Sequence, residues 1–114
     1  MLDNSPQFEL KLKEKAMYRV HYIFIPKDRA KMVDAIDESA AIWKKHGCHE
    51  VSIWQLGGSA IGQISFTVSF DNAGEFGSCS DKVAADPDFV AWQQKYGDNG
   101  DWQANTHARL MKKF

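Results

Sequence analysis

The segment VSFDNAGEFGSCSDKVAADPDFVAW, residues 68–92, contains the change from strand to helix that decides the fold. We expect the strand to end at Asp71 and a helix to begin after Asn72, with Glu75 three residues later completing a capping pair. The apolar stripe of this helix consists of Phe76, Cys79 and Val83. Glycines at 74 and 77 each weaken a helix by about 1 kcal/mol relative to alanine, so tertiary packing must hold it in place.

A second short helix is predicted to begin directly afterwards. Asp86 is a suitable N-cap, and Pro87 occupies the first helical position, where its missing amide proton costs nothing. The buried side of this helix is supplied by Phe89, Trp92 and Tyr96.

The chain before this segment alternates between strand and helix patterns. In MYRVHYIFIP, residues 17–26, alternate positions are apolar, which predicts a strand that ends at Pro26. From Asp28 to His46 apolar residues recur at helical spacing, and Gly47 is suited to the left-handed position that follows a helix. The segments HEVSIWQL (49–56) and ISFTVSF (64–70) predict two more strands, joined by a glycine-rich turn at 57–59. After the loop GDNGDW (97–102), ANTHARLMK (104–112) predicts a last strand.

The resulting order is βαββαβ, the α+β ferredoxin-like pattern with an antiparallel sheet and with the first and third strands in the centre. One sheet face is apolar and suits the helices: Tyr18, Val20, Tyr22 and Phe24, with Ile64, Phe66, Val68 and Phe70. The other face is expected to carry polar groups among apolar ones: Arg19, His21, Ser65, Thr67, Ser69, His107 and Arg109. A second copy of the chain packed on this mixed face would cover it, so we expect a homodimer.

Composition limits the remaining possibilities. A chain of 114 residues suits one domain, assigned to 17–114, preceded by an N-terminal extension at 1–16. Lysine and arginine number 14 against 15 acidic residues, which disfavours a nucleic-acid partner. Apolar runs such as YIFI are too short for the roughly 20 residues of a membrane helix, and residues 1–16 do not resemble a secretory signal, so a cytoplasmic protein is expected.

The stretches YRVHYIFIP, WKKHGC, FTVSFDNAGEF and DPDFVAW resemble the dimeric α/β-barrel superfamily, which includes antibiotic-biosynthesis monooxygenase-like and NIPSNAP-like proteins. The resemblance implies a homodimer whose two sheets form a barrel, with a small-molecule pocket in each subunit between sheet and helices. Members of the superfamily catalyse several unrelated reactions, so function has to be argued from residues. Haem-degrading members bind iron through a histidine of the later helices; residues 72–96 contain none, and no cofactor is expected.

The expected pocket is rich in aromatic side chains: Tyr18, Tyr22, Phe66, Phe76, Phe89 and Trp92. Such a pocket suits a small, mainly apolar molecule with one polar group. If the protein is an enzyme, the resemblance suggests a cofactor-independent monooxygenase or isomerase, with His21 or a tyrosine as the catalytic proton carrier. His21 and His107 are expected to be neighbours, with Arg19, Thr67 and Arg109 nearby, in a site or in a hydrated interface. The alternative is a non-catalytic structural or interaction dimer whose core is filled by its own side chains.

Other residues that often bind metals give weaker patterns here. His46, Cys48 and His49 lie within four residues, but no fourth ligand has matching spacing, so no metal site is predicted. Cys48 and Cys79 lie outside any CxxC spacing and are expected to pack as small side chains. GGSAIG (57–62) precedes a strand instead of a helix, which favours a turn over a phosphate-binding loop.

Overall fold

The computed structural model describes residues 17–114, so the predicted extension at 1–16 lies outside the described residues. The elements are β1 (Tyr18–Pro26), α2 (Arg29–Lys45), β2 (Glu50–Gln55), η1 (Gly58–Ala60), β3 (Ile64–Phe70), α3 (Ala73–Ala85), α4 (Pro87–Tyr96) and β4 (Gly100–Arg109). This order confirms the α+β ferredoxin-like prediction, with the second helical region divided into two helices at the expected place. None of the helices described is long and apolar enough to cross a membrane.

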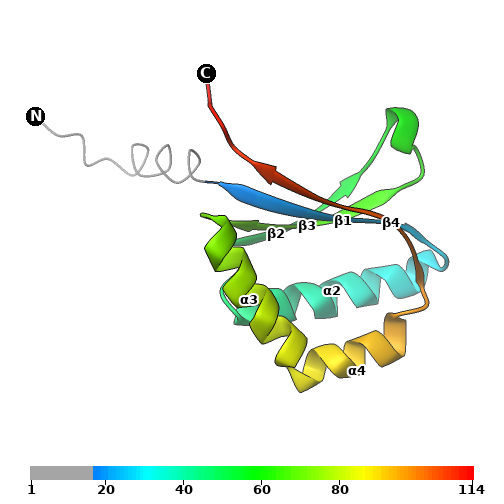
Figure 1. Cartoon of the computed structure of the whole chain (residues 1–114). Helices are drawn as coiled ribbons and strands as arrows, with labels where there is room; N and C mark the ends of the chain where they lie inside the picture. Colours follow the sequence, from blue (N-terminus) through cyan, green and yellow to red (C-terminus); the bar gives the residue numbers. More distant parts are fainter. Residues whose placement is uncertain (1–16) are drawn as a thin grey trace, which may run out of the picture.

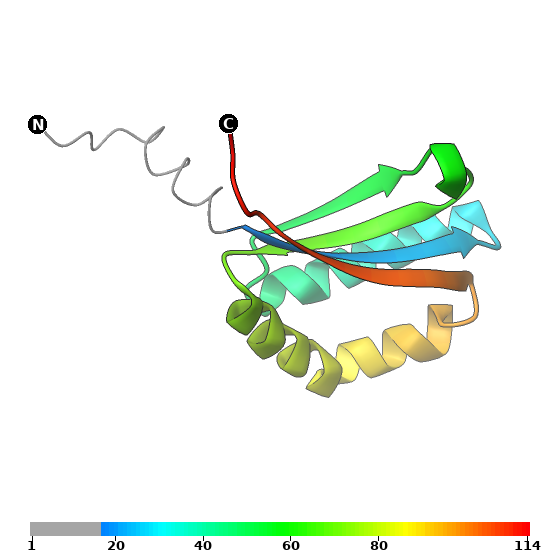
Figure 2. The same ribbon diagram turned by 45° about the horizontal axis from the view of Figure 1, so that its top comes forward.

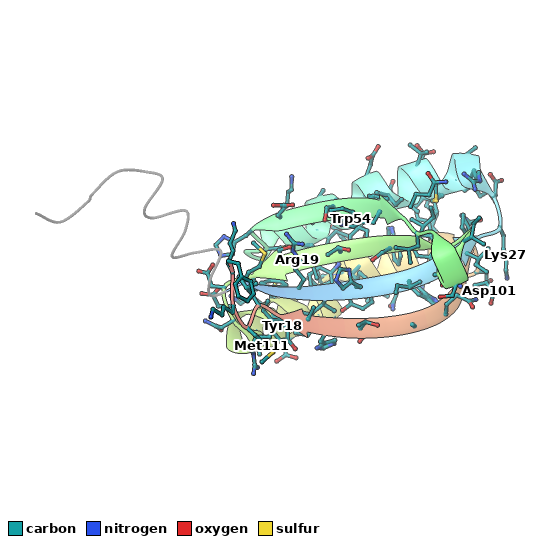
Figure 3. The ribbon with its side chains drawn as sticks, turned by 90° about the horizontal axis from the view of Figure 1, so that it is seen from above. Tyr18, Arg19, Lys27, Trp54, Asp101 and Met111 are labelled. Carbon is teal, nitrogen blue, oxygen red and sulfur yellow. The ribbon has the colours of Figure 1, made fainter. Side chains whose placement is uncertain are left out.

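The four strands form one antiparallel sheet in the order β2-β3-β1-β4, which confirms that the first and third strands are central. Helices α2, α3 and α4 all lie against one face of this sheet (Figures 1 and 2). Within residues 17–114, no helix lies on the opposite face (Figure 3). The fold therefore has two layers, and the helix-facing side of the sheet contains the core.

Local hydrogen bonds set the helix boundaries. The side chain of Asn72 accepts a hydrogen bond from the backbone N–H of Glu75 at 2.8 Å, and this begins α3. The carboxylate of Glu75 accepts from the N–H of Asp71 at 3.3 Å, one residue earlier than in a standard capping box. Asp86 accepts from the N–H of Asp88 at 2.9 Å and begins α4. Gly47 follows α2 with φ +102°, a backbone conformation that favours glycine.

Aromatic packing holds α3 on the sheet despite its glycines. The ring of Phe76 stacks on Trp43 of α2 with a centroid distance of 6.3 Å, and meets Phe70 of β3 edge-on at 5.5 Å. Phe70 is only 2% exposed, and Val20 and Val68 beside it are fully buried. Burial of these side chains supplies the stabilisation that the local sequence of α3 lacks.

The last strand begins earlier than predicted. Two hydrogen bonds of 3.0 Å join Asn99 to Asp28, and the N–H of Lys27 donates to the carbonyl of Asn99 at 2.8 Å. These contacts hold the loop before β4 against the end of β1, so pairing already starts between Pro26 and Gly100. The strand consequently includes part of the segment that the sequence assigned to a loop.

The register of β4 overturns one prediction about the mixed sheet face. His107 lies opposite Val20 and Arg109 opposite Tyr18, so both side chains are on the helix-facing side, whereas Thr106 lies opposite His21. The pairing shifts between Ile23 and Phe24, leaving one extra residue in β4. A strand has a side-chain period of two, so a register error of one residue moves every side chain to the other face. His107 and Arg109 are therefore not neighbours of His21 on that face.

Candidate functional site: the cavity between sheet and helices

A cavity of about 700 Å³ lies between the sheet and the helices. It is lined by residues of β1, β3 and β4 on the sheet side and of α2, α3 and α4 on the helix side. Eight aromatic side chains contribute to its walls: Tyr22, Phe24, Trp43, Phe66, Phe89, Trp92, Tyr96 and Trp102. This volume falls within the range of about 300–1,000 Å³ that is common for small-molecule sites.

The polar groups of the cavity wall are all uncharged. Besides the two tyrosines, they are two serines and four carboxamides: Ser39, Ser80, Gln93, Asn99, Gln103 and Asn105. Among the described residues that line the cavity there is no aspartate, glutamate, lysine, arginine, histidine or cysteine. An ionised ligand would lose its hydration there without gaining a counter-charge, so the wall favours a neutral molecule.

Tyr22 supplies a hydroxyl to the cavity wall. Burial, followed by the neighbouring thiol of Cys79, raises the pKa of Tyr22 to about 12. The phenol therefore stays protonated at neutral pH and can donate a hydrogen bond, but it is not a base. Its ring lies 6.0 Å from that of Trp43, which holds it on the helix-facing side of the sheet.

Trp92 forms a fixed wall of the cavity. Its ring is stacked on Phe89 with a centroid distance of 5.6 Å and an interplanar angle of 9°. Its indole N–H donates to the backbone carbonyl of Ala35 in α2 at 2.8 Å. The hydrogen bond satisfies the polar end of the indole, so the planar surface of the ring is held in place between α2 and α4.

Of the six side chains predicted to form the pocket, Tyr22, Phe66, Phe89 and Trp92 line the cavity. Tyr18 and Phe76 do not belong to the lining. They lie beside it in an aromatic cluster, in which Phe76 is 6.1 Å from Tyr18 and meets the ring of His107 edge-on at 5.3 Å.

A chain of hydrogen bonds runs from this cluster to the cavity wall. The hydroxyl of Tyr18 and Nδ1 of His107 are 2.6 Å apart, and Nε2 of His107 is 3.0 Å from Oδ1 of Asn105. The amide nitrogen of Asn105 donates to the backbone carbonyl of His21 at 3.3 Å. Asn105 is itself a cavity-lining residue, so the chain connects His107 to the cavity.

His21, the predicted proton carrier, lies on the sheet face away from the cavity. Its Nδ1 is 2.8 Å from the hydroxyl of Thr67 and 3.3 Å from that of Ser65. Burial lowers the pKa of His21, and the positive charge of Arg19 lowers it further. Neutral imidazole accepting from Thr67 fits these contacts. The structure thus brings together His21, Thr67 and Arg19 as predicted, but separates them from the pocket side chains.

The uncovered sheet face combines apolar and buried polar groups. Trp54 and Ile25 are 46% and 39% exposed on it, and Figure 3 shows Trp54 and Arg19 on this side. The hydroxyls of Ser65 and Thr67 bond to each other at 2.9 Å, whereas that of Ser69 is buried without a partner among the described residues. An unpaired buried hydroxyl on the same sheet face as exposed apolar side chains is typical of a surface that is covered in an assembly.

The three potential metal ligands within residues 46–49, which are His46, Cys48 and His49, contact different partners. His46 bonds to Asp86 at 2.7 Å, and the thiol of Cys48 bonds to the backbone carbonyl of Glu50 at 3.2 Å. Burial raises the pKa of Cys48 and of Cys79, so both thiols stay protonated, in keeping with packing roles. His49 faces two other acidic side chains, Asp71 and Glu75.

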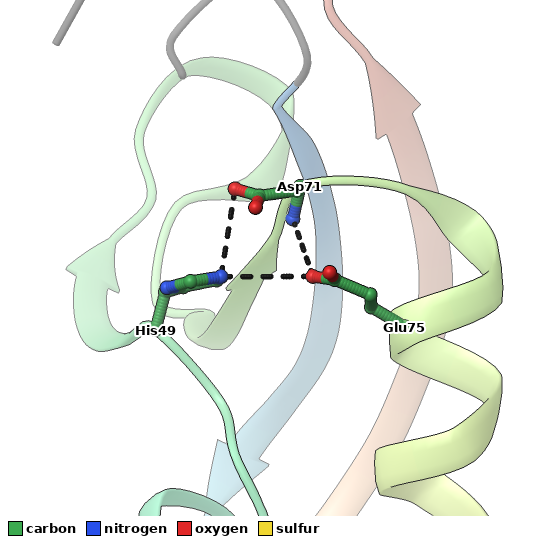
Figure 4. A group of neighbouring side chains, drawn as sticks. All are labelled: His49, Asp71 and Glu75. Atoms are coloured by element: carbon green, nitrogen blue, oxygen red, sulfur yellow. Dashed lines mark hydrogen bonds and ion pairs between the residues drawn. The ribbon is translucent and has the colours of Figure 1, made fainter. Parts of the chain in front are cut away.

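His49, Asp71 and Glu75 form the group of described side chains whose donor atoms could share a metal ion, all within 4.8 Å of one another (Figure 4). Nε2 of His49 is 3.4 Å from Asp71 and 3.6 Å from Glu75. Pairing of β2 with β3 brings these distant residues together, a contact that sequence spacing does not reveal. Besides the contacts of His49, the N–H of Asp71 donates a hydrogen bond to Glu75. These contacts explain the arrangement without a metal ion: it is a solvated cluster that joins β2, β3 and α3.

Asp86 joins α2 to the start of α4. Its carboxylate is 5% exposed and accepts hydrogen bonds from Lys45 at 2.8 Å and from His46. The bond from Lys45, then that from His46, holds the pKa of Asp86 well below its usual value. This cluster is charged, unlike the cavity wall, and it holds the end of α2 against the start of α4.

The cavity residues that the sequence did not predict include a group at the start of β4 and just before it: Asn99, Trp102, Gln103 and Asn105. Asn99 and Trp102 were assigned to a loop, and Gln103 lay just before the predicted strand. Trp102 is 57% exposed and packs on Phe24 at 5.7 Å, so it lies where the cavity meets solvent. Several carboxamide side chains lie close together in the sequence between residues 99 and 105, and this could have indicated a binding site. Uncharged amides beside aromatic residues suit a neutral ligand.

Comparison of the sequence with models of known families and with curated proteins finds no match. Solved structures do match. A NIPSNAP family protein of unknown function from Agrobacterium tumefaciens has a TM-score of 0.65 at 18% identity, over 82% of this chain and 86% of that one. An uncharacterised NIPSNAP-like domain protein from Burkholderia xenovorans has a TM-score of 0.63 at 7% identity, over 87% of each chain. A cofactor-independent oxygenase from Streptomyces nogalater has a TM-score of 0.58 at 10% identity, over 82% of this chain and 89% of that one.

These similarities agree with the resemblance seen in the sequence. Identities of 7–18% show a shared fold and leave function to be argued from the cavity. The chain thus shares the ferredoxin-like α+β fold of these NIPSNAP-like and monooxygenase-like structures.

Proposed function

We propose that this protein binds a neutral, mainly aromatic small molecule in the cavity between its sheet and helices. The observation that carries the proposal is a cavity of about 700 Å³ whose wall combines eight aromatic rings with uncharged hydrogen-bonding groups. Stacked Phe89 and Trp92 offer a flat apolar surface, and Tyr22 offers a protonated hydroxyl. These features suit a planar ligand that carries one or two carbonyl or hydroxyl groups.

The reaction class we propose is cofactor-independent oxygenation or isomerisation. A structural neighbour from Streptomyces nogalater is described as a cofactor-independent oxygenase, which supports this class. Described residues of the cavity wall include no side chain that is anionic at neutral pH, so a substrate would have to lose its proton through its own acidity or to water. The wall would then act by orienting the substrate and by donating hydrogen bonds to a developing oxyanion. Dioxygen would be the oxidant of an oxygenase of this kind.

We further propose that two copies of the chain associate through the uncovered sheet face. Exposed Trp54 and Ile25 would become buried, and the unpaired hydroxyl of Ser69 would gain a partner. The alternative is an interaction dimer without a ligand. It predicts the same association but an unoccupied cavity, so ligand analysis separates the two functions.

Native mass spectrometry of the freshly purified protein, followed by denaturing extraction, tests the proposal. A dimer that releases a stoichiometric neutral aromatic compound supports it, and the compound identifies the substrates to assay. Trp102→Ala, at the rim of the cavity, should reduce retention of the compound, whereas Val33→Ala, 55% exposed on α2 and outside the cavity lining, should not. A ligand-free protein that also fails to bind neutral aromatic probes would contradict the proposal.

A further inference from the structure

The hydrogen bonds of Asn105 to His21 and His107 fix the orientation of its carboxamide. The backbone carbonyl of His21 can only accept, so the group of Asn105 that faces it at 3.3 Å must be the amide nitrogen. The amide oxygen then faces Nε2 of His107 at 3.0 Å, and that nitrogen must carry a hydrogen. The other ring nitrogen, Nδ1, shares a hydrogen bond of 2.6 Å with the hydroxyl of Tyr18, which holds the far side of the imidazole.

Aromatic contacts keep the imidazole of His107 in this orientation. Its ring meets Tyr18 edge-on at 5.7 Å and Phe76 edge-on at 5.3 Å. Phe76 is in turn stacked on the buried Trp43, so the cluster is anchored in the core. These contacts, together with the bond to Tyr18, favour the ring orientation in which Nε2 faces Asn105.

This arrangement has a consequence for the cavity. The amide nitrogen of Asn105 has two hydrogens, of which the carbonyl of His21 takes one. The other is available to a molecule in the cavity that Asn105 lines. Without His107 only the 3.3 Å bond to the carbonyl of His21 would hold the carboxamide, and the direction of its second N–H would no longer be fixed from the oxygen side.

We propose that Tyr18 and His107 are positioning residues that help to hold the carboxamide of Asn105 as a hydrogen-bond donor toward the cavity, so that the cavity selects neutral ligands bearing a carbonyl oxygen. The inference rests on the proposed function, since it assumes that the cavity binds a neutral aromatic molecule. Neither Tyr18 nor His107 lines the cavity, and both act through Asn105.

The test compares two fluorescent probes that share a ring system: 6-propionyl-2-(dimethylamino)naphthalene, which has a carbonyl, and 2-(dimethylamino)naphthalene, which does not. Their dissociation constants are measured by titration of the full-length protein. The wild type should prefer the carbonyl probe, and Tyr18→Phe or His107→Leu should reduce this preference roughly three- to tenfold, the effect expected for one hydrogen bond. His107→Gln, whose amide can donate from a similar position, should retain most of it.

Two further variants keep the experiment decisive. Asn105→Leu removes the donor itself and must lose the preference even if a substitution at His107 disturbs folding. Thr106→Val, the neighbouring residue on the opposite sheet face, should leave the preference unchanged. If both probes bind but the preference survives in Asn105→Leu or in a folded His107→Leu, the inference is overturned while the proposed function stands. If neither probe binds the wild type, the proposed function fails and the inference falls with it.

Discussion

His21 and Tyr22 are adjacent in β1, yet they serve opposite faces of the sheet: Tyr22 lines the cavity, and His21 bonds to Thr67 at 2.8 Å on the uncovered face. Residues that are adjacent in a strand therefore lie on opposite faces of the sheet and do not share a site. The hydroxyl of Tyr22 and the carboxamides are among the polar groups that line the cavity, whereas the imidazole of His21 belongs to the face proposed for association.

This relationship predicts different effects of two conservative substitutions on ligand binding. Tyr22→Phe should weaken binding of a carbonyl-bearing aromatic probe by roughly two- to tenfold, because one hydrogen bond is lost. His21→Gln should leave the affinity within about twofold, since His21 is outside the cavity lining. Fluorescence titration of both variants measures the effect. A larger loss in His21→Gln than in Tyr22→Phe would contradict the placement of the site.

Stability and binding should respond to different aromatic residues. Phe70 is 2% exposed and outside the cavity lining, so Phe70→Ala should reduce the free energy of unfolding by about 3–5 kcal/mol. Trp102 is 57% exposed and lines the cavity, so Trp102→Ala should cost about 1 kcal/mol or less but weaken probe binding severalfold. Urea denaturation and probe titration of each variant separate the two quantities. Equal losses of stability would argue that Trp102 is ordinary core.

Acid stability should depend on Asp86. The pKa of Asp86 is lowered in the folded state, first by the hydrogen bond from Lys45, so its stabilising contribution is complete above the unfolded pKa of about 3.9 and is lost as the pH falls toward the folded value. Asp86→Asn should keep the cap on Asp88 but lack the titrating charge. The stability advantage of the wild type over this variant should therefore shrink from about pH 4 downward, as measured by urea denaturation at pH 7, 4 and 3. Parallel pH curves for the two proteins would refute this role.

The proposed association surface can be tested by its charge tolerance. Trp54→Glu places a carboxylate on the uncovered sheet face, and an unpaired buried charge there should prevent association. Light scattering during size exclusion should give about twice the chain mass of 12.9 kDa for the wild type and the chain mass for the variant. Val33→Glu, on the solvent side of α2, is the control and should remain a dimer. A wild type that is already monomeric would exclude the association.

Much of the fold followed from local features of the sequence. Alternation in Tyr18–Pro26 and Ile64–Phe70 predicted the central strands and their apolar face, because a strand exposes successive side chains to opposite sides. The caps at Asn72 and Asp86 predicted where α3 and α4 begin, because the side chain and the backbone group that it satisfies are only two or three residues apart. Four of the six aromatic residues expected in a pocket do line the cavity. Their spacing along a strand or helix indicated which face of that element they occupy.

The tertiary structure alone decided the composition of the site. The register of β4 depends on contacts between Asn99 and Asp28, 71 residues apart, and on the extra residue opposite the step from Ile23 to Phe24. That register moved His107 to the helix-facing side, and with it created the chain from Tyr18 to Asn105. A cavity is likewise the space left between packed layers, which no single segment encodes. Local patterns determined which side chains could face inward, and long-range pairing determined which of them meet.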